Sequence, residues 1–290
     1  MPTFVYKTTP QSSLRLDRMA AEPGPGLAPA VLWIHGGALI FGSRQWWRPW
    51  QVERYRRAGY AFLAMDYRLA PETKLPAIRE DLQDAWQWIQ KYGRDQLKID
   101  PRRVAVVGHS AGGYLTLLAG ACLKPASAAL VSFYGYGDII GPWYSQPDSF
   151  YRSTEKPVSE AAARACVGEK ELVEGLDDRF PFYLYCRQQG RWPCEVAGRD
   201  PRQEPGFFAA FCPVQNVTRH YPPTILLHGD KDTDVPCAQS KMMAAALKKA
   251  GVEHELCIIP GGEHSFDQDQ NHPSVQEAFR RVLAFLHQHL

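Results

Sequence analysis

The chain has 290 residues, of which 45% are hydrophobic and 22% are charged, and this composition is that of a folded globular protein rather than a disordered one. A net charge of +2 gives neither a basic nor an acidic field, so the composition argues against a nucleic-acid partner or an anionic membrane surface. No apolar stretch approaches the roughly 18 residues of a membrane-spanning helix, so we expect no integral membrane association.

The N-terminus and the cysteines predict a cytoplasmic protein. The opening residues, MPTFVYKTTPQSSLRL, lack a basic segment followed by an apolar run, so no secretory signal is predicted. The seven cysteines form no C-x-x-C pair and have no zinc-site spacing. We therefore expect reduced cysteines and no metal site.

Apolar runs rich in β-branched residues alternate with helical patterns along most of the chain, which is typical of a mostly parallel sheet. The first two runs are separated only by a turn, which predicts an antiparallel hairpin. The eight predicted strands cover residues 3–8, 13–19, 30–35, 60–66, 103–109, 129–134, 223–228 and 255–260.

Three helices are predicted from apolar residues at helical spacing: 76–93, 238–251 and 275–290. Residues 138–220 break the alternation, because they contain short helical stretches and scattered prolines but no clear strand. A structureless loop of this length is improbable, so we predict a helical cap there. The catalytic core would then comprise residues 1–137 and 221–290.

A candidate nucleophile lies in the stretch VAVVGHSAGGYLTLLAG, residues 104–120. Ser110 is the centre of a G-x-S-x-G pentapeptide between a predicted strand and a predicted helix, the pattern of a nucleophile elbow. Its turn is so tight that side chains at positions 108 and 112 would collide with the backbone, which explains the glycines. Its hydroxyl would lie above a helix N-terminus, which favours a developing anion.

A serine nucleophile needs a base and a carboxylate that orients it. His264 lies in a glycine-rich loop after the last predicted strand, at the edge where strand-end loops of a parallel sheet meet. His109 is expected to point away, towards structure. In LLHGDKDTDVP we choose Asp232 as the carboxylate, and we expect Asp230 to cap the turn and Asp234 to cap a following helix.

Small residues follow the third predicted strand in LWIHGGALIFGS. They would let backbone amides approach a reacting carbonyl. We assign the amides of Gly37, Ala38 and Ala111 to an oxyanion hole.

These motifs resemble those of the α/β-hydrolase superfamily, specifically esterases and lipases related to hormone-sensitive lipase. The resemblance rests on HGGALIFGS, DYRLAPE, GHSAGG, HGDKDTDVP and GGEHSF, which extend from residue 35 to residue 267. It implies an α/β-hydrolase fold: eight mostly parallel strands flanked by helices, with the cap between the sixth and seventh strands. It also implies structural roles for Asp66, Arg68 and Glu72 as buried polar supports.

Two departures from the family pattern matter. Ala38 replaces the third glycine of H-G-G-G, and it adds a methyl group to the pocket wall. Only a short segment precedes the third strand, so the cap would come from residues 138–220. This brings the chain closer to the small feruloyl-esterase-like, kynurenine-formamidase-like and peptidase-like members. Trp143 and Tyr144 are candidates for the pocket wall, with the core of the cap as the alternative.

The expected function is hydrolysis of a small-molecule carboxylic ester through an acyl-enzyme on Ser110, with Asp232 and His264 completing a triad and no cofactor required. Amide cleavage, as in an arylformamidase or a peptidase, would use the same residues. A non-catalytic small-molecule receptor is a further alternative from a different class. The sequence leaves the oligomeric state open.

Overall fold

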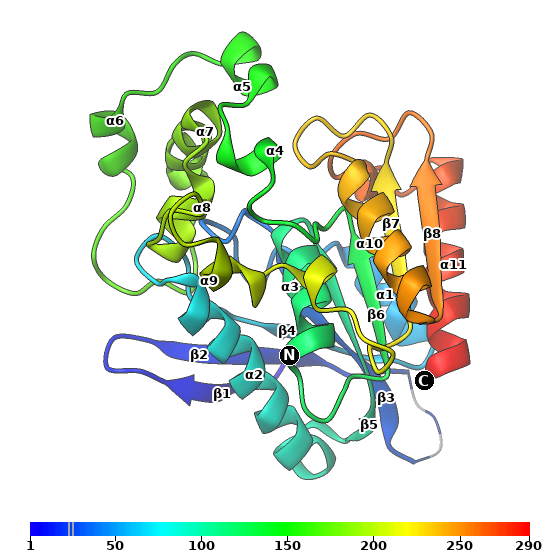
Figure 1. The fold of residues 1–290 in the computed structure, drawn as a ribbon. Helices are drawn as coiled ribbons and strands as arrows, with labels where there is room; N and C mark the ends of the chain where they lie inside the picture. The colour runs from blue at the N-terminus through cyan, green and yellow to red at the C-terminus, as the bar shows by residue number, and fades with distance from the viewer. Residues whose placement is uncertain (23, 25) are drawn as a thin grey trace.

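A twisted sheet forms the centre of the computed structural model, which describes residues 1–22, 24 and 26–290 (Figure 1). Its strands are β1 (Thr3–Thr8), β2 (Ser13–Met19), β3 (Ala28–Ile34), β4 (Ala61–Met65), β5 (Ile99–His109), β6 (Ala129–Phe133), β7 (Thr224–Gly229) and β8 (His254–Ile259). They form an eight-stranded sheet in the order β1-β2-β4-β3-β5-β6-β7-β8. The pairs β1–β2 and β2–β4 are antiparallel and the other neighbouring pairs are parallel, which confirms the predicted sheet.

Helices cover both faces of the sheet. Helices α2 (Leu75–Tyr92), α3 (Ala111–Cys122) and α10 (Ala238–Ala250) pack on one face, and α1 (Pro49–Arg57) and α11 (Pro273–His289) pack on the other. The predicted helices at 76–93, 238–251 and 275–290 correspond to α2, α10 and α11 within a few residues. A single π-helical turn, η1 (Gly93–Leu97), connects α2 to β5.

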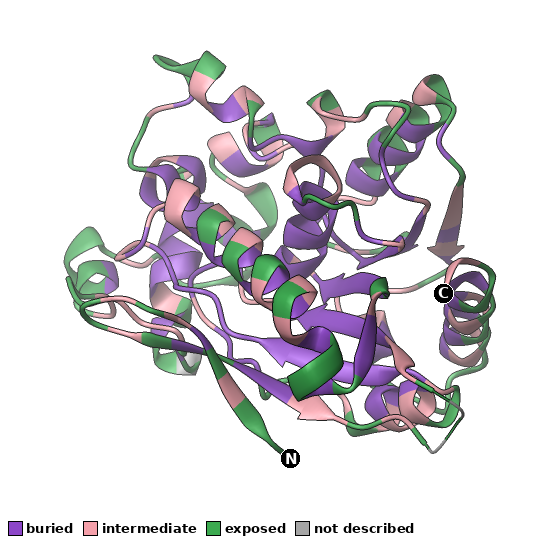
Figure 2. Cartoon of the chain, turned by 90° about the horizontal axis from the view of Figure 1, so that it is seen from below, coloured by how far each residue is buried: buried purple, intermediate pink, exposed green. Residues whose placement is uncertain are grey.

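Alternating side chains of the central strands supply two apolar cores. In β3, Leu32 and Ile34 pack with the α3 side of the sheet, whereas Val31 and Trp33 pack with α1 and α11. This is the two-residue period of a strand that is buried on both faces. In Figure 2 the strands at the centre are coloured as buried, and the helices expose residues on their outward sides.

The chain between β6 and β7 folds into short helices beside the end of the sheet (Figure 1). These are α4 (Pro142–Ser145), α5 (Ser149–Thr154), α6 (Glu160–Arg164), η2 (Asp177–Arg179), α7 (Phe180–Gln189), α8 (Trp192–Ala197), α9 (Pro205–Ala209) and η3 (Pro213–Gln215). Prolines occupy the first turns of α4, α7, α8 and α9, where their missing amide costs no hydrogen bond.

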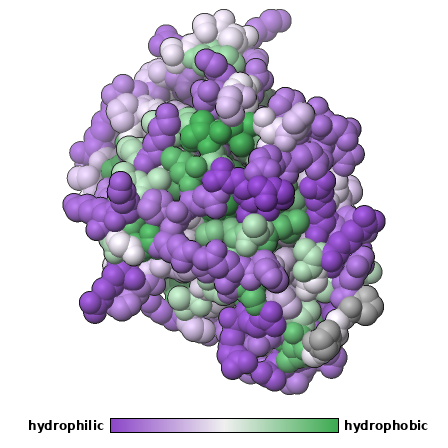
Figure 3. Space-filling view, turned by 90° about the vertical axis from the view of Figure 1, so that its right-hand side faces the viewer, coloured by the Kyte–Doolittle hydropathy of each residue, from purple (hydrophilic) through white to green (hydrophobic). Residues whose placement is uncertain are grey.

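On the face with β8 and α11, hydrophilic residues dominate and hydrophobic residues show between them (Figure 3). Within the residues that the structure describes, no helix has the length and hydropathy needed to cross a membrane. The loops that follow β3, β5, β6, β7 and β8 gather at the carboxyl ends of these strands, beside the helical segment. In parallel sheets, ligand sites lie at this edge.

Candidate active site

The turn after β5 holds Ser110 in an unusual backbone conformation, with φ 55° and ψ −118°. A Cβ atom at Gly108 would lie 2.1 Å from the carbonyl oxygen of Gly112, and one at Gly112 would lie 2.1 Å from that of Ile34. Both contacts are far shorter than a carbon–oxygen contact can be, so both positions require glycine. The sharp turn predicted from the sequence is therefore present, and it lifts the Ser110 hydroxyl above the first residue of α3.

Three side chains from different strand ends form a continuous hydrogen-bonded chain. The Nε2 atom of His264 lies 3.1 Å from the Ser110 hydroxyl oxygen, and its Nδ1 atom lies 2.7 Å from Oδ2 of Asp232. The structure thus brings together the three residues that the sequence analysis selected from different motifs. When Nδ1 carries a proton and donates it to Asp232, Nε2 has a free lone pair that can accept the serine proton.

The Asp232 carboxylate is completely buried, and both of its oxygens accept hydrogen bonds. Its Oδ1 atom accepts hydrogen bonds from the backbone amides of Asp234 and Val235, at 2.9 and 2.8 Å. Oδ2 also lies 3.3 Å from Nε2 of His228. Burial alone would raise the pKa of Asp232, but hydrogen bonds from His228 and His264 outweigh it and hold the pKa well below its usual range. Asp232 is therefore ionised at neutral pH.

His264 is surrounded by negative charge. Burial opposes protonation of the ring, but the nearby Asp234 and Asp232 carboxylates outweigh it and raise the pKa of His264 above its ordinary value. Its ring also packs edge-on against Tyr134, with the ring centroids 4.8 Å apart. The site therefore favours the charged imidazolium, the form that this histidine would take after removing a proton from Ser110.

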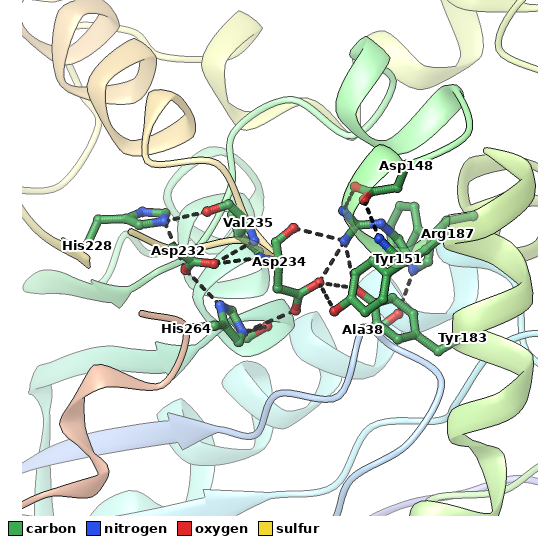
Figure 4. Close-up of polar contacts among 12 residues, drawn as sticks. Ala38, Asp148, Tyr151, Tyr183, Arg187, His228, Asp232, Asp234, Val235 and His264 are labelled. Atoms are coloured by element: carbon green, nitrogen blue, oxygen red, sulfur yellow. Dashed lines mark hydrogen bonds and ion pairs between the residues drawn. The ribbon is translucent and has the colours of Figure 1, made fainter. Parts of the chain in front are cut away.

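Asp234 does not cap a helix, and that prediction was wrong. The N-cap residue of α10 is Cys237, while the Asp234 carboxylate turns towards the helical segment between β6 and β7. There Oδ1 accepts hydrogen bonds from Tyr151, Tyr183 and Arg187 (Figure 4). Asp230 lies in the turn after β7, and its Oδ1 atom accepts a 2.7 Å hydrogen bond from the amide of Gly261, in the turn after β8. It therefore connects these two turns.

A buried carboxylate that the sequence analysis missed, Asp267, lies behind the site. It accepts hydrogen bonds from Arg48 at 2.7 and 3.0 Å, from Gln51 at 2.7 Å and from Tyr134 at 2.8 Å. His109 approaches the same carboxylate at 3.1 Å. Apart from its place three residues after His264, nothing in the sequence distinguishes Asp267 from exposed carboxylates, because its partners come from distant segments.

His109 is buried in this network, as expected for a structural residue, but it does not turn away from the site. Its ring stacks on Phe133, accepts a 3.0 Å hydrogen bond from the indole of Trp33 and forms part of the cavity wall beside Ser110. Burial lowers the pKa of His109. A neutral ring that accepts at Nδ1 carries its proton on Nε2, facing Asp267.

The loop after β3 presents the predicted oxyanion amides. Gly37 and Ala38 line the same cavity as Ser110, and among the described residues no backbone carbonyl accepts a hydrogen bond from either amide. Ala111 is the first residue of α3, so its amide is one of the unpaired donors of a helix N-terminus. The Ala38 carbonyl points the other way and accepts a 2.9 Å hydrogen bond from Trp192. The amides are thus free to meet a ligand.

A cavity of about 480 Å³ opens over Ser110 and His264. Aromatic side chains form much of its wall, including Phe41, Trp46, Phe180 and Tyr183. Polar side chains line it as well, and besides the two histidines they include the charged Arg48 and Asp234. A concave space in which aromatic walls are combined with convergent polar groups is the usual form of a small-molecule site.

Trp143 and Tyr144 are not among the residues that line this cavity. Tyr144 is 2% exposed and its ring stacks between those of Trp143 and Trp192, at centroid distances of 3.8 and 4.1 Å. They form an aromatic core within the helical segment, which was the alternative left open by the sequence.

The polar residues of DYRLAPE are buried and paired, as the resemblance implied. Asp66 accepts hydrogen bonds from Arg44, and Arg68 donates to Asp81 at 2.7 and 2.8 Å. Glu72 accepts from Arg179 at 2.7 and 2.9 Å. The last of these pairs connects the β4–α2 loop to the residue just before α7.

The family model BD-FAE matches residues 16–247 of the chain. The chain belongs to the BD-FAE family of α/β-hydrolase esterases. A second model, described as the dienelactone hydrolase family, matches residues 208–290, which include Asp232 and His264.

Similar proteins include both long synthases and esterases. The non-reducing polyketide synthase ausA of Aspergillus calidoustus is 28% identical over 90% of this BD-FAE chain, which spans 13% of that synthase. Esterase LipC of Mycobacterium tuberculosis is 26% identical over 83% of the chain and 53% of LipC. The chain thus spans between about an eighth and about half of the length of these relatives.

Solved structures agree on the fold. An α/β hydrolase superfamily protein from Enterococcus faecalis has a TM-score of 0.76 and 24% identity, with 95% of this BD-FAE chain and 96% of that chain covered. A Staphylococcus aureus protein with unknown function has a TM-score of 0.82, 22% identity and coverage of 100% and 99%. The propionate-bound thermophilic esterase Est2 of Thermogutta terrifontis has a TM-score of 0.69, 22% identity and coverage of 99% and 93%.

Proposed function

We propose that this protein is a serine carboxylesterase that cleaves small to medium carboxylic esters through an acyl-enzyme on Ser110. The observation that carries the proposal is the hydrogen-bonded chain from Asp232 through His264 to Ser110, which opens into the cavity next to free backbone amides. Membership of a family of α/β-hydrolase esterases and the similarity to esterase LipC support the ester reaction.

In the first step, the Ser110 oxygen attacks the ester carbonyl carbon while Nε2 of His264 takes the hydroxyl proton. The carbonyl oxygen becomes an oxyanion, which the amides of Gly37, Ala38 and Ala111 stabilise. Each such donor typically contributes ~10²–10³ in rate. His264 then gives its proton to the leaving alcohol, and the acyl group remains on Ser110.

In the second step, water takes the place of the alcohol. Nε2 of His264 removes a proton from the water as the water attacks the acyl carbon, and it returns that proton to the Ser110 oxygen as the acid leaves. Throughout, Asp232 holds the imidazole in the tautomer with Nδ1 protonated. The same residues serve both half-reactions, and the chemistry requires no cofactor.

The cavity supports a limited substrate size. Its volume of about 480 Å³ lies in the lower half of the range usual for small-molecule sites, which favours short and medium acyl chains. We further propose that residues 138–220 act as a cap over the site, because Tyr151, Phe180 and Tyr183 contribute to the cavity wall.

Initial rates on p-nitrophenyl esters from acetyl to palmitoyl test the proposal, with p-nitroanilide and N-formyl-arylamine analogues measured in parallel. Ser110→Ala is the inactive reference, and Thr233→Ala, which removes another hydroxyl of the cavity wall, is the matched control. We expect turnover of short esters that only Ser110→Ala abolishes. Turnover of the amides alone would assign the protein as an amidase. No turnover by a folded protein would refute the hydrolase and favour a receptor.

A further inference from the structure

Two carboxylates face the His264 imidazole, one at each nitrogen. Asp232 lies 2.7 Å from Nδ1, and Oδ2 of Asp234 lies 3.4 Å from Nε2. Figure 4 shows the two carboxylates on either side of the histidine. The mechanism uses only the first of them. The second faces the nitrogen that exchanges protons with Ser110, and therefore it can influence the step itself.

Asp234 is held in place by side chains from the helical segment. Its Oδ1 atom accepts hydrogen bonds from Tyr151 at 3.0 Å, from Tyr183, and from Arg187 at 2.7 Å. Because these donors all meet Oδ1, the Oδ2 atom remains turned towards His264 and the cavity. The side chain is 17% exposed, so solvent screens it only in part.

The charge on Asp234 is not cancelled by its cationic partner. Arg187 is 1% exposed and also pairs with Asp148, whose Oδ2 atom lies 2.5 Å from Nη2. One guanidinium therefore serves two carboxylates, and this cluster keeps a net negative charge. A carboxylate this close favours the charged form of a neighbouring histidine.

We propose that Asp234 is a positioning residue that stabilises the imidazolium of His264 from its Nε2 side, and that α5 and α7 hold it there. In the resting site Nε2 has a lone pair, which accepts the Ser110 proton. Once Nε2 is protonated, it becomes a donor for which Oδ2 of Asp234 is an acceptor within reach. This inference rests on the proposed function, since it assigns a role in the proton transfer from Ser110.

Other charged or titratable groups also face His264, from every element packed against it. Asp232 from the β7–α10 loop and Tyr134 after β6 contact the ring, and His109 of β5 and Asp267 lie near it. His228 of β7 and Arg48 before α1 lie one contact further away, against Asp232 and Asp267 respectively. The Arg48 guanidinium pairs with Asp267 and balances its charge, while the neutral His109 ring faces the same carboxylate. The Asp234 carboxylate is one of the nearby charges that raise the pKa of His264, together with Asp232 and Asp267.

The direct test is an NMR titration of the His264 ring in the wild type and in two variants, with the resonance assigned by comparison with His264→Asn. Asp234→Asn removes the charge that faces Nε2. Asp230→Asn is the matched control, because it neutralises another carboxylate of the β7–α10 loop, one that accepts from the Gly261 amide and takes no part in the Arg187 cluster. We expect Asp234→Asn to lower the pKa of His264 by about one unit or more, and Asp230→Asn to change it much less.

The pH profile of ester hydrolysis gives a second readout. In Asp234→Asn the acidic limb of kcat/KM should move to lower pH by the same amount, while a merely structural role would lower the rate at every pH without moving the limb. An unshifted His264 in Asp234→Asn, or equal shifts in both variants, would overturn the proposal. The titration needs no turnover, so a wild type without esterase activity would refute the proposed function while the role of Asp234 is still measured.

Discussion

Replacing Asp232 with asparagine isolates the contribution of the buried carboxylate. The two Asp232 oxygens accept different hydrogen bonds: Oδ1 accepts from the backbone amides of Asp234 and Val235, and Oδ2 accepts from His264. In Asp232→Asn the amide oxygen must remain with the two backbone donors. The new NH₂ group then faces His264, so Nδ1 has to accept, the proton moves to Nε2, and Nε2 can no longer take the proton of Ser110.

The expected fall in kcat of Asp232→Asn has two causes, the lost negative charge and the wrong tautomer of His264. With charge centres roughly 4 Å apart and an effective dielectric of about 20, the carboxylate stabilises the imidazolium by about 4 kcal/mol, a factor of about 10³ in rate. The unfavourable tautomer adds to this, and we expect kcat to fall ~10³–10⁴-fold. The new NH₂ group would also face the Nε2–H group of His228, so two donors would oppose each other. This Nε2–H group donates to the carbonyl of Val235 at 2.9 Å.

The assay is steady-state hydrolysis of a short p-nitrophenyl ester at a pH on the activity plateau. Asp230→Asn is the matched control in the same loop, because asparagine keeps the oxygen that accepts from Gly261. We expect it to stay within about twofold of the wild type, since surface substitutions cost little. If Asp232→Asn retained more than a tenth of the wild-type kcat, the proposed tautomer control would be refuted.

Three further predictions follow from the site and its supports. The raised pKa of His264 places the acidic limb of the kcat/KM profile above about pH 6.5, the ordinary value for histidine, and a limb at or below that pH would contradict the electrostatic argument. Asp267→Asn leaves the Arg48 guanidinium without its carboxylate and should lower the free energy of unfolding by about 3–5 kcal/mol in urea titrations. The exposed Asp269→Asn should change that free energy by less than about 0.5 kcal/mol, and equal effects would disprove the role of burial. Gly112→Ala puts a Cβ atom 2.1 Å from a backbone oxygen, so it should prevent folding or abolish activity in a shifted turn; a folded, fully active variant would refute this reading of the turn.

Much of the fold and the central part of the candidate site could be predicted because the signals are local. Strand and helix patterns have periods of two and about 3.6 residues, so a short window reveals them. Ser110, Asp232 and His264 each follow a predicted strand, and parallel strands bring such positions to one edge. The predicted element boundaries were less accurate. For example, β5 begins at Ile99 rather than at residue 103, and the prediction missed its first residues because polar and apolar side chains do not alternate regularly there.

The residues that were misjudged or missed depend on distant contacts. Asp234 fits a helix-cap pattern locally, but its carboxylate accepts a hydrogen bond from Arg187, which is 47 residues earlier in the chain. Asp267 and Arg48 are separated by 219 residues. The aromatic rings of Trp143 and Tyr144 could serve a cavity or a core equally well by composition. Only the packing of Trp192 against Tyr144 decides between these roles.

The contact between the buried guanidinium of Arg187 and the partly exposed carboxylate of Asp234 has a consequence for protein engineering and for divergence among relatives. A chimera that exchanged the helices between β6 and β7 for those of a relative would leave Asp234 without its guanidinium and its two phenols. The new enzyme would then differ in the basicity of its histidine as well as in the shape of its pocket. If Asp234 acts on His264 as proposed, substrate range and pH optimum are coupled in this chain, and a transplant that changes one of them will also change the other.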